Sequence, residues 1–153
     1  MMPTVRYASL DDLDLIAPLF AAYRVFYEQA YDLATARAFI AERLALRESV
    51  ILLALDEKDD AGAALGFIQL YPIFSSIAAQ RIWLLSDLFV SDAAREQGVA
   101  RQLMNKATQH ARDSGAAWLE LSTAHTNTKA QALYESLGYQ LDTVYRYYSL
   151  AAN

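Results

Sequence analysis

Residues 87–100 read DLFVSDAAREQGVA and are the most informative part of the chain. It predicts the end of a β-strand, a short turn and the start of a helix that continues through residues 101–104. The first N–H groups of a helix lack intrahelical partners and lie at its positive end, so they can bind an anion such as a pyrophosphate. Gly98 leaves room for a phosphate, and Arg95 can add positive charge. The alternative is a plain junction, with Arg95 solvated and Gly98 easing a bend.

Other site motifs are missing from the sequence. No Gly is followed by Lys and then Ser or Thr, which excludes a Walker loop, and only one glycine of the nicotinamide fingerprint is present. The five glycines never form G-x-S-x-G, the nucleophile elbow of hydrolases. With no cysteine and two histidines, we expect no disulfide, no thiol nucleophile and no metal site.

The 153 residues, 55% of them hydrophobic, fit a single domain spanning 1–153. The net charge of −5 argues against nucleic acid as a partner and favours a cationic small substrate. The N-terminus lacks the apolar core of a signal peptide, and no apolar run approaches the roughly 18 residues that span a membrane. We therefore expect a cytoplasmic protein without a membrane partner.

The spacing of apolar residues predicts strands and helices along the rest of the chain. Strands are expected at Thr4–Ala8, Val50–Leu55, Leu65–Phe74, Ile82–Val90, Trp118–Leu121 and Tyr139–Leu150. Helices are expected after Ser9, after the Tyr27–Asp32 stretch, between Gly98 and Gly115, and at Thr128–Leu137, with a polar turn over Asp56–Gly62. This order predicts an α/β fold whose mixed, twisted sheet has about six to seven strands, flanked by about four helices. The first half is expected to be antiparallel and the second partly parallel.

A second motif lies at residues 127–139, which read NTKAQALYESLGY, or N-x-x-A-x-x-L-Y-x-x-x-G-Y. Together with Arg95-x-x-Gly98-x-Ala100, it strongly resembles the GNAT family of N-acetyltransferases. The resemblance is close over Ile82–Tyr139, and the order of elements extends it loosely to the whole chain. It implies a GNAT-like fold and an enzyme that uses acetyl-CoA as cosubstrate.

The resemblance also implies roles for individual residues. Backbone amides of the first motif would hold the pyrophosphate of the cofactor, helped by Arg95: Gln97, Gly98, Val99, Ala100 and Arg101. The backbone of Leu88, Phe89 and Val90 would pair with the pantetheine arm as an added strand does. Asn127 would hydrogen-bond the cofactor near its thioester, and Tyr134 would lie close to the sulfur.

Acetyl transfer to an amine explains these residue types. A primary amine has a pKa of about 10.4 and must lose a proton before it attacks a thioester. A backbone N–H of the strand at Leu88–Val90 can stabilise the oxyanion that forms. The leaving thiolate needs a proton, which makes Tyr134 the expected general acid. Alternatively, Tyr134 is a core aromatic, because it shares one helix face with Ala130, Leu133 and Leu137.

The sequence offers three candidates for the group that removes a proton from the amine. Residues 71–76 and 82–90 resemble the diamine and polyamine acetyltransferase branch of the family, in which a Glu often occupies the position of Ser86 here. Asp87 matches the Asp that follows, and we expect it to face away from Ser86, since side chains alternate along a strand. Asp87, His125 and water are the candidate bases. The structural alternatives are a loop cap or Arg partner for Asp87 and a solvated surface position for His125.

Two positions depart from the motif. Glu96 stands where the family usually has Gly, and its charge should weaken cofactor binding unless it points to solvent. Ala100 replaces a second Gly with another small residue.

The expected acceptor pocket contains Tyr27, Glu28, Asp32 and Tyr71, which could hold a cationic amine by charge and cation–π contact. Alternatively, Glu28 and Asp32 form an ordinary solvated helix boundary. Three tyrosines near the C-terminus indicate a dimer contact and hence a homodimer: Tyr145, Tyr147 and Tyr148.

The predicted function is direct acetyl transfer from acetyl-CoA to a primary amine of a small, polyamine-like substrate. Two alternatives remain at this point. One is a protein lysine or N-terminal acetyltransferase, and the other is a non-catalytic acyl-CoA-binding module.

Overall fold

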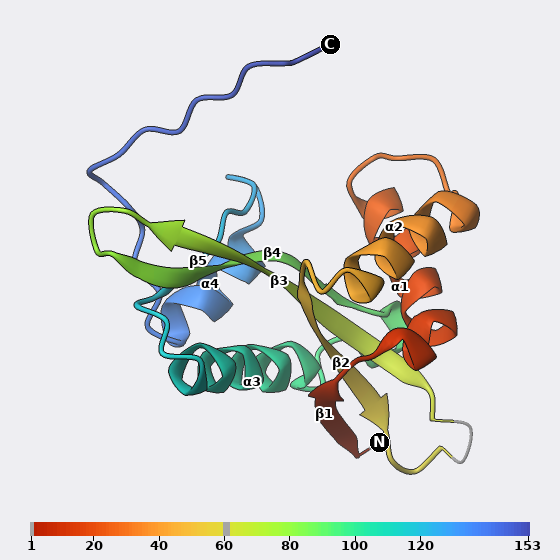
Figure 1. Ribbon diagram of the computed structural model, residues 1–153. Coiled ribbons are helices and arrows are strands. Elements are labelled where there is room, and N and C mark those ends of the chain that lie inside the picture. Colours follow the sequence, from red (N-terminus) through yellow and green to blue (C-terminus); the bar gives the residue numbers. More distant parts are fainter. Residues whose placement is uncertain (1, 60–61) are drawn as a thin grey trace. The chain divides into compact units, whose positions relative to one another are not determined.

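The computed structural model describes residues 2–59 and 62–153 (Figure 1). The chain forms two compact units, one ending at Leu121 and the other comprising Ser122–Asn153. Each unit is described by itself below. In the described part of the chain, no helix has the length and hydropathy needed to cross a membrane.

The first unit is built on one mixed sheet whose strand order is β1-β2-β3-β4-β5. Its strands are β1 (Pro3–Tyr7), β2 (Val50–Asp56), β3 (Ala64–Ser75), β4 (Gln80–Val90) and β5 (Leu119–Glu120). Neighbouring strands are antiparallel from β1 to β4, whereas β5 runs parallel to β4. The predicted α/β class with a mixed sheet is confirmed. The predicted number of strands is wrong, because the described residues form a 5-stranded sheet.

Helices cover both faces of this sheet (Figure 1). The helices α1 (Leu13–Phe26) and α2 (Leu33–Ala45) pack together on one face, where Ile16, Phe20 and Ile40 join a core with Phe67 and Phe89 of the sheet. The helix α3 (Val99–Asp113) lies on the opposite face and buries Leu103, Met104 and Ala107. Short 3-10 turns occupy Leu10–Asp12 and Asp92–Ala94.

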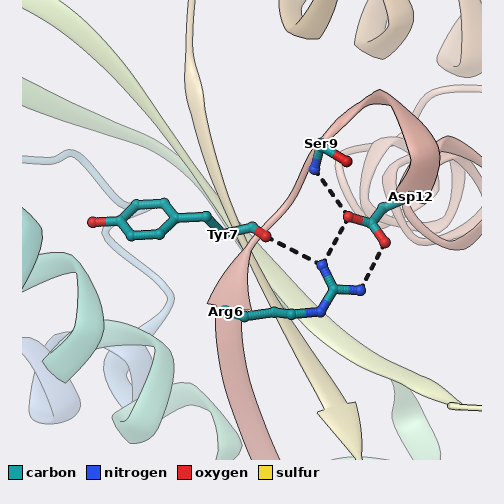
Figure 2. Close-up of polar contacts among 4 residues, drawn as sticks. All are labelled: Arg6, Tyr7, Ser9 and Asp12. Carbon is teal, nitrogen blue, oxygen red and sulfur yellow. Dashed lines mark hydrogen bonds and ion pairs between the residues drawn. The ribbon is translucent and has the colours of Figure 1, made fainter.

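The passage from β1 into α1 is fixed by a buried carboxylate (Figure 2). Arg6 donates two hydrogen bonds to Asp12, from Nη1 to Oδ2 at 2.8 Å and from Nη2 to Oδ1 at 2.7 Å. The backbone N–H of Ser9 also donates to Asp12 Oδ2, at 2.9 Å. Hydrogen bonds from Arg6, more than its charge, lower the pKa of the Asp12 carboxyl.

The second unit contains α4 (Thr128–Ser136), as predicted, but its C-terminal part differs from the prediction. The expected strand over Tyr139–Leu150 is wrong: these residues are described and have no regular secondary structure. Asp142 Oδ1 instead accepts the backbone N–H groups of Val144 at 2.8 Å and of Tyr145 at 3.2 Å. Such a side-chain turn competes with strand pairing for the backbone donors.

The remaining differences are small. The strand predicted at 118–121 shortens to β5, while those predicted at 4–8, 50–55, 65–74 and 82–90 correspond to β1 to β4. The polar turn predicted over 56–62 includes residues 60 and 61, which lie outside the described residues.

Candidate active site

The edge of β4 carries the backbone that is predicted to bind the cofactor arm. On one side, Leu88, Phe89 and Val90 pair with Ile68, Phe67 and Gly66 of β3. On the other side, β5 pairs with β4 only at Trp83 and Leu84 within the described residues of the first unit. The edge from Leu88 to Val90 is therefore without a strand partner in this unit. An extended ligand can pair with such an edge as an added strand does.

A β-bulge interrupts β4 just before this edge. Gln69 lies opposite Asp87 and Leu70 lies opposite Leu85, so Ser86 is an extra residue in β4. Trp83 lies on the α3 side, where its Nε1 donates to Ser114 Oγ at 2.9 Å. Phe89 lies on the other side, in the core with α1 and α2. In a regular strand, Trp83, Asp87 and Phe89 would all lie on one face, because side chains alternate. The extra residue reverses the alternation after Leu85, so Asp87 lies with Phe89 on the face covered by α1 and α2.

The Asp87 carboxylate is buried by this arrangement, with 6% of the residue exposed. Gln69 Nε2 donates to Asp87 Oδ2, and Ser86 Oγ donates to Asp87 Oδ1 at 3.1 Å. The expectation that Asp87 faces away from Ser86 is therefore wrong, because the bulge breaks the alternation of side chains. Among the described residues, the donors to Asp87 are uncharged. Burial raises the pKa of the Asp87 carboxyl, while hydrogen bonds from Gln69, Tyr23 and Ser86 oppose that increase.

Two tyrosines, Tyr23 and Tyr71, lie close to this carboxylate. The Tyr23 hydroxyl of α1 donates to the backbone carbonyl of Ser86 at 3.2 Å, and the Tyr23 ring lies 5.0 Å from the Tyr27 ring, centroid to centroid. Burial and the nearby charge of Asp87 raise the pKa of Tyr71 to about 12. The structure thus brings Asp87 close to Tyr71, and Tyr23 links that cluster to Tyr27.

The two acidic residues of the expected pocket occupy the turn between α1 and α2. Asp32 caps α2: its Oδ1 accepts the Thr35 backbone N–H at 3.0 Å, and its Oδ2 accepts the Thr35 hydroxyl at 2.7 Å. These hydrogen bonds lower the pKa of the Asp32 carboxyl. Glu28 is exposed in a left-handed conformation with φ of 66°. Asp32 therefore serves as the N-cap of α2, which agrees with the alternative of an ordinary helix boundary.

The start of α3 has the geometry of an anion cradle. Gly98, the N-cap residue, has φ of 80°, and apart from the adjoining chain no heavy atom of the described residues lies within 4 Å of the position that a Cβ would take there. The first-turn amides that follow Gly98 lie at the positive end of the α3 dipole. Glu96 precedes them, exposed and with φ of 62°. Open space beside first-turn amides fits a pyrophosphate, so these residues suit the cofactor that the sequence predicts.

Arg95 turns back toward β4. Its Nε donates to the Val90 carbonyl at 3.1 Å, and its Nη1 lies 2.9 Å from Asp92 Oδ1. Its guanidinium carbon lies 5.7 Å from the centre of the Phe89 ring. Nearby, Gln97 Nε2 donates to the Ala93 carbonyl at 3.2 Å. Arg95 thus hydrogen-bonds the end of β4. Its direct contact with a phosphate stays a prediction.

In the second unit, Asn127 and Tyr134 lie on one helix. Asn127 caps α4, since its Oδ1 accepts the Ala130 backbone N–H at 3.2 Å. Tyr134 is half-buried two turns later, and its ring centroid lies 6.0 Å from that of Tyr139. His125 is exposed, and its carbonyl accepts Gln131 Nε2 at 3.1 Å.

Sequence reasoning did not assign site roles to Tyr23 and Gln69. Gln69 carried a usable signal, because it is the polar residue in the middle of the apolar strand that was predicted over 65–74. Tyr23 carried none, since it fits the apolar face of α1 like any core residue. A metal is not indicated either: in residues 2–59 and 62–153, no three His, Cys, Asp or Glu side chains gather to hold one.

Comparisons with known proteins agree with this geometry. Residues 16–139 match the model of the acetyltransferase (GNAT) family. The chain is 47% identical over 146 residues to an uncharacterised N-acetyltransferase of Bacillus subtilis, covering 95% of each. It is also 31% identical over 91 residues to a D-amino-acid N-acetyltransferase of Saccharomyces cerevisiae, covering 60% of this chain and 56% of the yeast protein.

A solved structure is also similar. The crystal structure of a probable acetyltransferase superposes with a TM-score of 0.91 at 42% identity and covers 98% of both chains. Members of the GNAT family use acetyl-CoA as cosubstrate. With its sheet, its helices and its relatives in agreement, the chain belongs to the GNAT family and is an acetyltransferase.

Proposed function

We propose that the protein transfers the acetyl group of acetyl-CoA directly to a primary amine of a small, polyamine-like molecule. The observation that carries this proposal is the position of Asp87, a buried carboxylate that immediately precedes the edge of β4 without a strand partner among the described residues of the first unit. A carboxylate among tyrosine rings attracts an ammonium group by charge and by cation–π contact. The resemblance of residues 71–76 and 82–90 to the polyamine branch supports the same choice of substrate.

The first unit supplies the groups that would bind the cosubstrate. Acetyl-CoA brings an acyl group activated as a thioester. The first-turn amides after Gly98 would bind its pyrophosphate, since they lie at the positive end of the α3 dipole beside open space at Gly98. The backbone of Leu88–Val90 would orient its arm and direct an N–H toward the carbonyl oxygen.

Two proton transfers complete the proposed reaction. Asp87 would accept a proton from the ammonium group through a water molecule, since the residue is only 6% exposed. Its raised pKa makes this carboxylate a stronger base than an ordinary aspartate. In the second unit, Tyr134 Oη would donate a proton to the departing sulfur, and the side-chain amide of Asn127 would bind the cosubstrate near the thioester.

A panel of acceptors tests the substrate class. Free thiol release from acetyl-CoA would be followed with diamines, polyamines, aminoglycosides, amino acids and lysine peptides at matched concentrations. We expect the highest kcat/KM for diamines and polyamines. A preference for peptides would indicate a protein acetyltransferase instead. Binding of acetyl-CoA without thiol release for any amine would indicate a non-catalytic module.

The predicted homodimer has a candidate contact in the C-terminal segment. Its large apolar side chains are exposed in the single chain: Leu141, Val144, Tyr145, Tyr147, Tyr148 and Leu150. A group of exposed large apolar side chains is typical of protein interfaces. We expect sedimentation velocity to show a dimer that dissociates when Tyr147 and Tyr148 are both changed to Ser. A wild-type monomer at every concentration would contradict the proposed dimer.

A further inference from the structure

A chain of buried polar contacts crosses the sheet beneath the β4 bulge. Ser49, which directly precedes β2, donates from Oγ to Gln69 Oε1 at 2.8 Å. Gln69, in β3, donates from Nε2 to Asp87 Oδ2 in β4. The three residues are 9%, 0% and 6% exposed, respectively. Burying polar groups in a sheet core is costly unless each is hydrogen-bonded, so this chain depends on all of its members.

The contacts fix the orientation of the Gln69 amide. Oε1 accepts from Ser49, and the Nε2 donors face Asp87 and Tyr71. The Ser49 hydroxyl can donate or accept, so the orientation is fixed by the Asp87 carboxylate, which only accepts when ionised. Reversing the amide would place an oxygen lone pair against the Asp87 carboxylate. Gln69 can therefore only donate to Asp87 in this position.

Two aspartates of the same unit show what a neutral donor achieves. Asp12 is held by the cationic Arg6, and its carboxyl has a lowered pKa. Asp87 is held by the neutral Gln69, and the pKa of its carboxyl is raised by burial. Burial therefore outweighs the opposing hydrogen bond from Gln69, which holds the Asp87 carboxylate without placing a positive charge beside it.

We propose that Gln69 is the positioning residue of the active site: it holds the Asp87 carboxylate at the β4 bulge, and Ser49 anchors the other end of the Gln69 amide by a hydrogen bond. This inference rests on the proposed role of Asp87 as the base. The other groups that face Asp87 are Ser86 of β4, Tyr23 of α1 and Tyr71 of β3. Arg43 of α2 and Glu48 act on Tyr71 by charge, so they belong to the same electrostatic environment.

The test is the titration of Asp87 in a Gln69→Leu variant, which removes the donor at similar volume. Carboxyl carbon NMR on protein labelled at aspartate Cγ follows Asp87 without any substrate, and Asp87→Asn assigns the signal. Loss of one hydrogen bond to a charged group should raise the apparent pKa of Asp87 by about one unit. The acidic limb of kcat/KM, with spermidine as acceptor, should move by the same amount. The affinity for acetyl-CoA should stay unchanged.

Matched variants separate positioning from general loss of stability. Ser49→Ala should shift the titration in the same direction by a smaller amount, because it frees the Gln69 amide without removing it. Ser114→Ala removes another internal hydrogen bond, the one from Trp83 on the α3 side, and should leave the Asp87 titration unchanged. If Gln69→Leu does not fold, Gln69→Met and Ser49→Ala carry the test.

An Asp87 titration that is identical in wild-type and folded Gln69→Leu protein would overturn the proposal. So would an acidic limb that does not move while activity falls equally at every pH. Failure of the proposed function looks different: Asp87→Asn would then keep full turnover and the wild-type pH profile, whatever Gln69→Leu does.

Discussion

At the scale of single residues, the chemistry depends on where a charge is buried and on what holds it. Asp87 has uncharged donors among the described residues, so its ionised form gains hydrogen bonds but no opposing charge. Burial of this kind disfavours the charged form and raises the pKa of an acid. The buried charge lowers the stability of the folded protein, as is common for residues that are retained for function.

The first prediction concerns Asp87→Asn. Because the folded-state pKa of Asp87 is raised above its unfolded value, its contribution to stability is present below the unfolded pKa and is lost as pH rises through the folded pKa. Near neutral pH, the Asn variant should therefore unfold at the same urea concentration as wild type or a higher one. Its kcat/KM should fall by about 10²–10⁴. A variant that is less stable but fully active would contradict the assignment of the base.

The second prediction concerns Tyr134→Phe. Loss of the general acid should lower kcat by about 10²–10⁴, with little change in the affinity for acetyl-CoA measured by calorimetry. Tyr139→Phe is the matched control, because the Tyr139 hydroxyl is buried and has no hydrogen-bond partner among the described residues. The control should keep its activity. Equal turnover in Tyr134→Phe and wild-type protein would remove Tyr134 from the mechanism.

At the scale of elements, α1 and α3 are each fixed at their N-termini by a local feature that the sequence shows only in part. For α1, the feature is the bidentate pair of Arg6 and Asp12. For α3, it is the left-handed Gly98. The Gly98 turn could be predicted from its motif, whereas the Asp12 pair joins residues whose contact depends on the path of the backbone.

The third prediction concerns Asp12→Ala, which removes an internal charged acceptor. We expect a loss of about 1–3 kcal/mol in the free energy of unfolding, measured with urea at pH 7. Because the folded-state pKa of Asp12 is lowered, this stabilisation is present above the unfolded pKa and is lost as pH falls through the folded one. The control is Asp14→Ala, which breaks the exposed pair with Arg37 and should cost at most about 1 kcal/mol. Equal effects of the two variants would contradict this ranking.

The fourth prediction concerns Gly98→Asp, which places charge and bulk in the proposed phosphate cradle. Calorimetry should show acetyl-CoA binding weakened at least about tenfold. Gly115→Asp is the control at the opposite end of α3, because Gly115 also has a positive φ, of 71°, and no described heavy atom near its Cβ position. Backbone strain should then be similar in the two variants. If both weaken binding equally, strain rather than the cradle explains the loss.

The turn at Gly98 and the bulge at Ser86 differ in how far the sequence predicts them. The strand, turn and helix around Gly98 were predictable because periodicity and a glycine coincide there. The bulge at Ser86 was not, because a period-2 pattern gives no sign of one extra residue. The extra residue Ser86 determines the face on which Asp87 lies. The sequence therefore did not indicate that Gln69 and Tyr23 are partners of Asp87.

At the scale of the whole molecule, the same limit explains the strand that was wrongly predicted at Tyr139–Leu150. Alternating aromatic residues favour a strand, but a strand also needs a partner, and pairing is not written in a local pattern. The described chain instead exposes the large apolar side chains from Leu141 onward, with Tyr148 86% and Leu150 95% accessible. The α/β class, the mixed sheet and the family were predictable because two separate motifs agreed with the order of elements.

The most direct test of the account is a mass spectrum of the protein mixed with acetyl-CoA and spermidine, recorded for both small molecules and intact protein. Mono-acetylated spermidine should accumulate over many turnovers while the protein keeps the mass of its unmodified chain. An acetyl group retained on the protein, or acetyl-CoA that is bound but left intact beside unmodified amine, would contradict it.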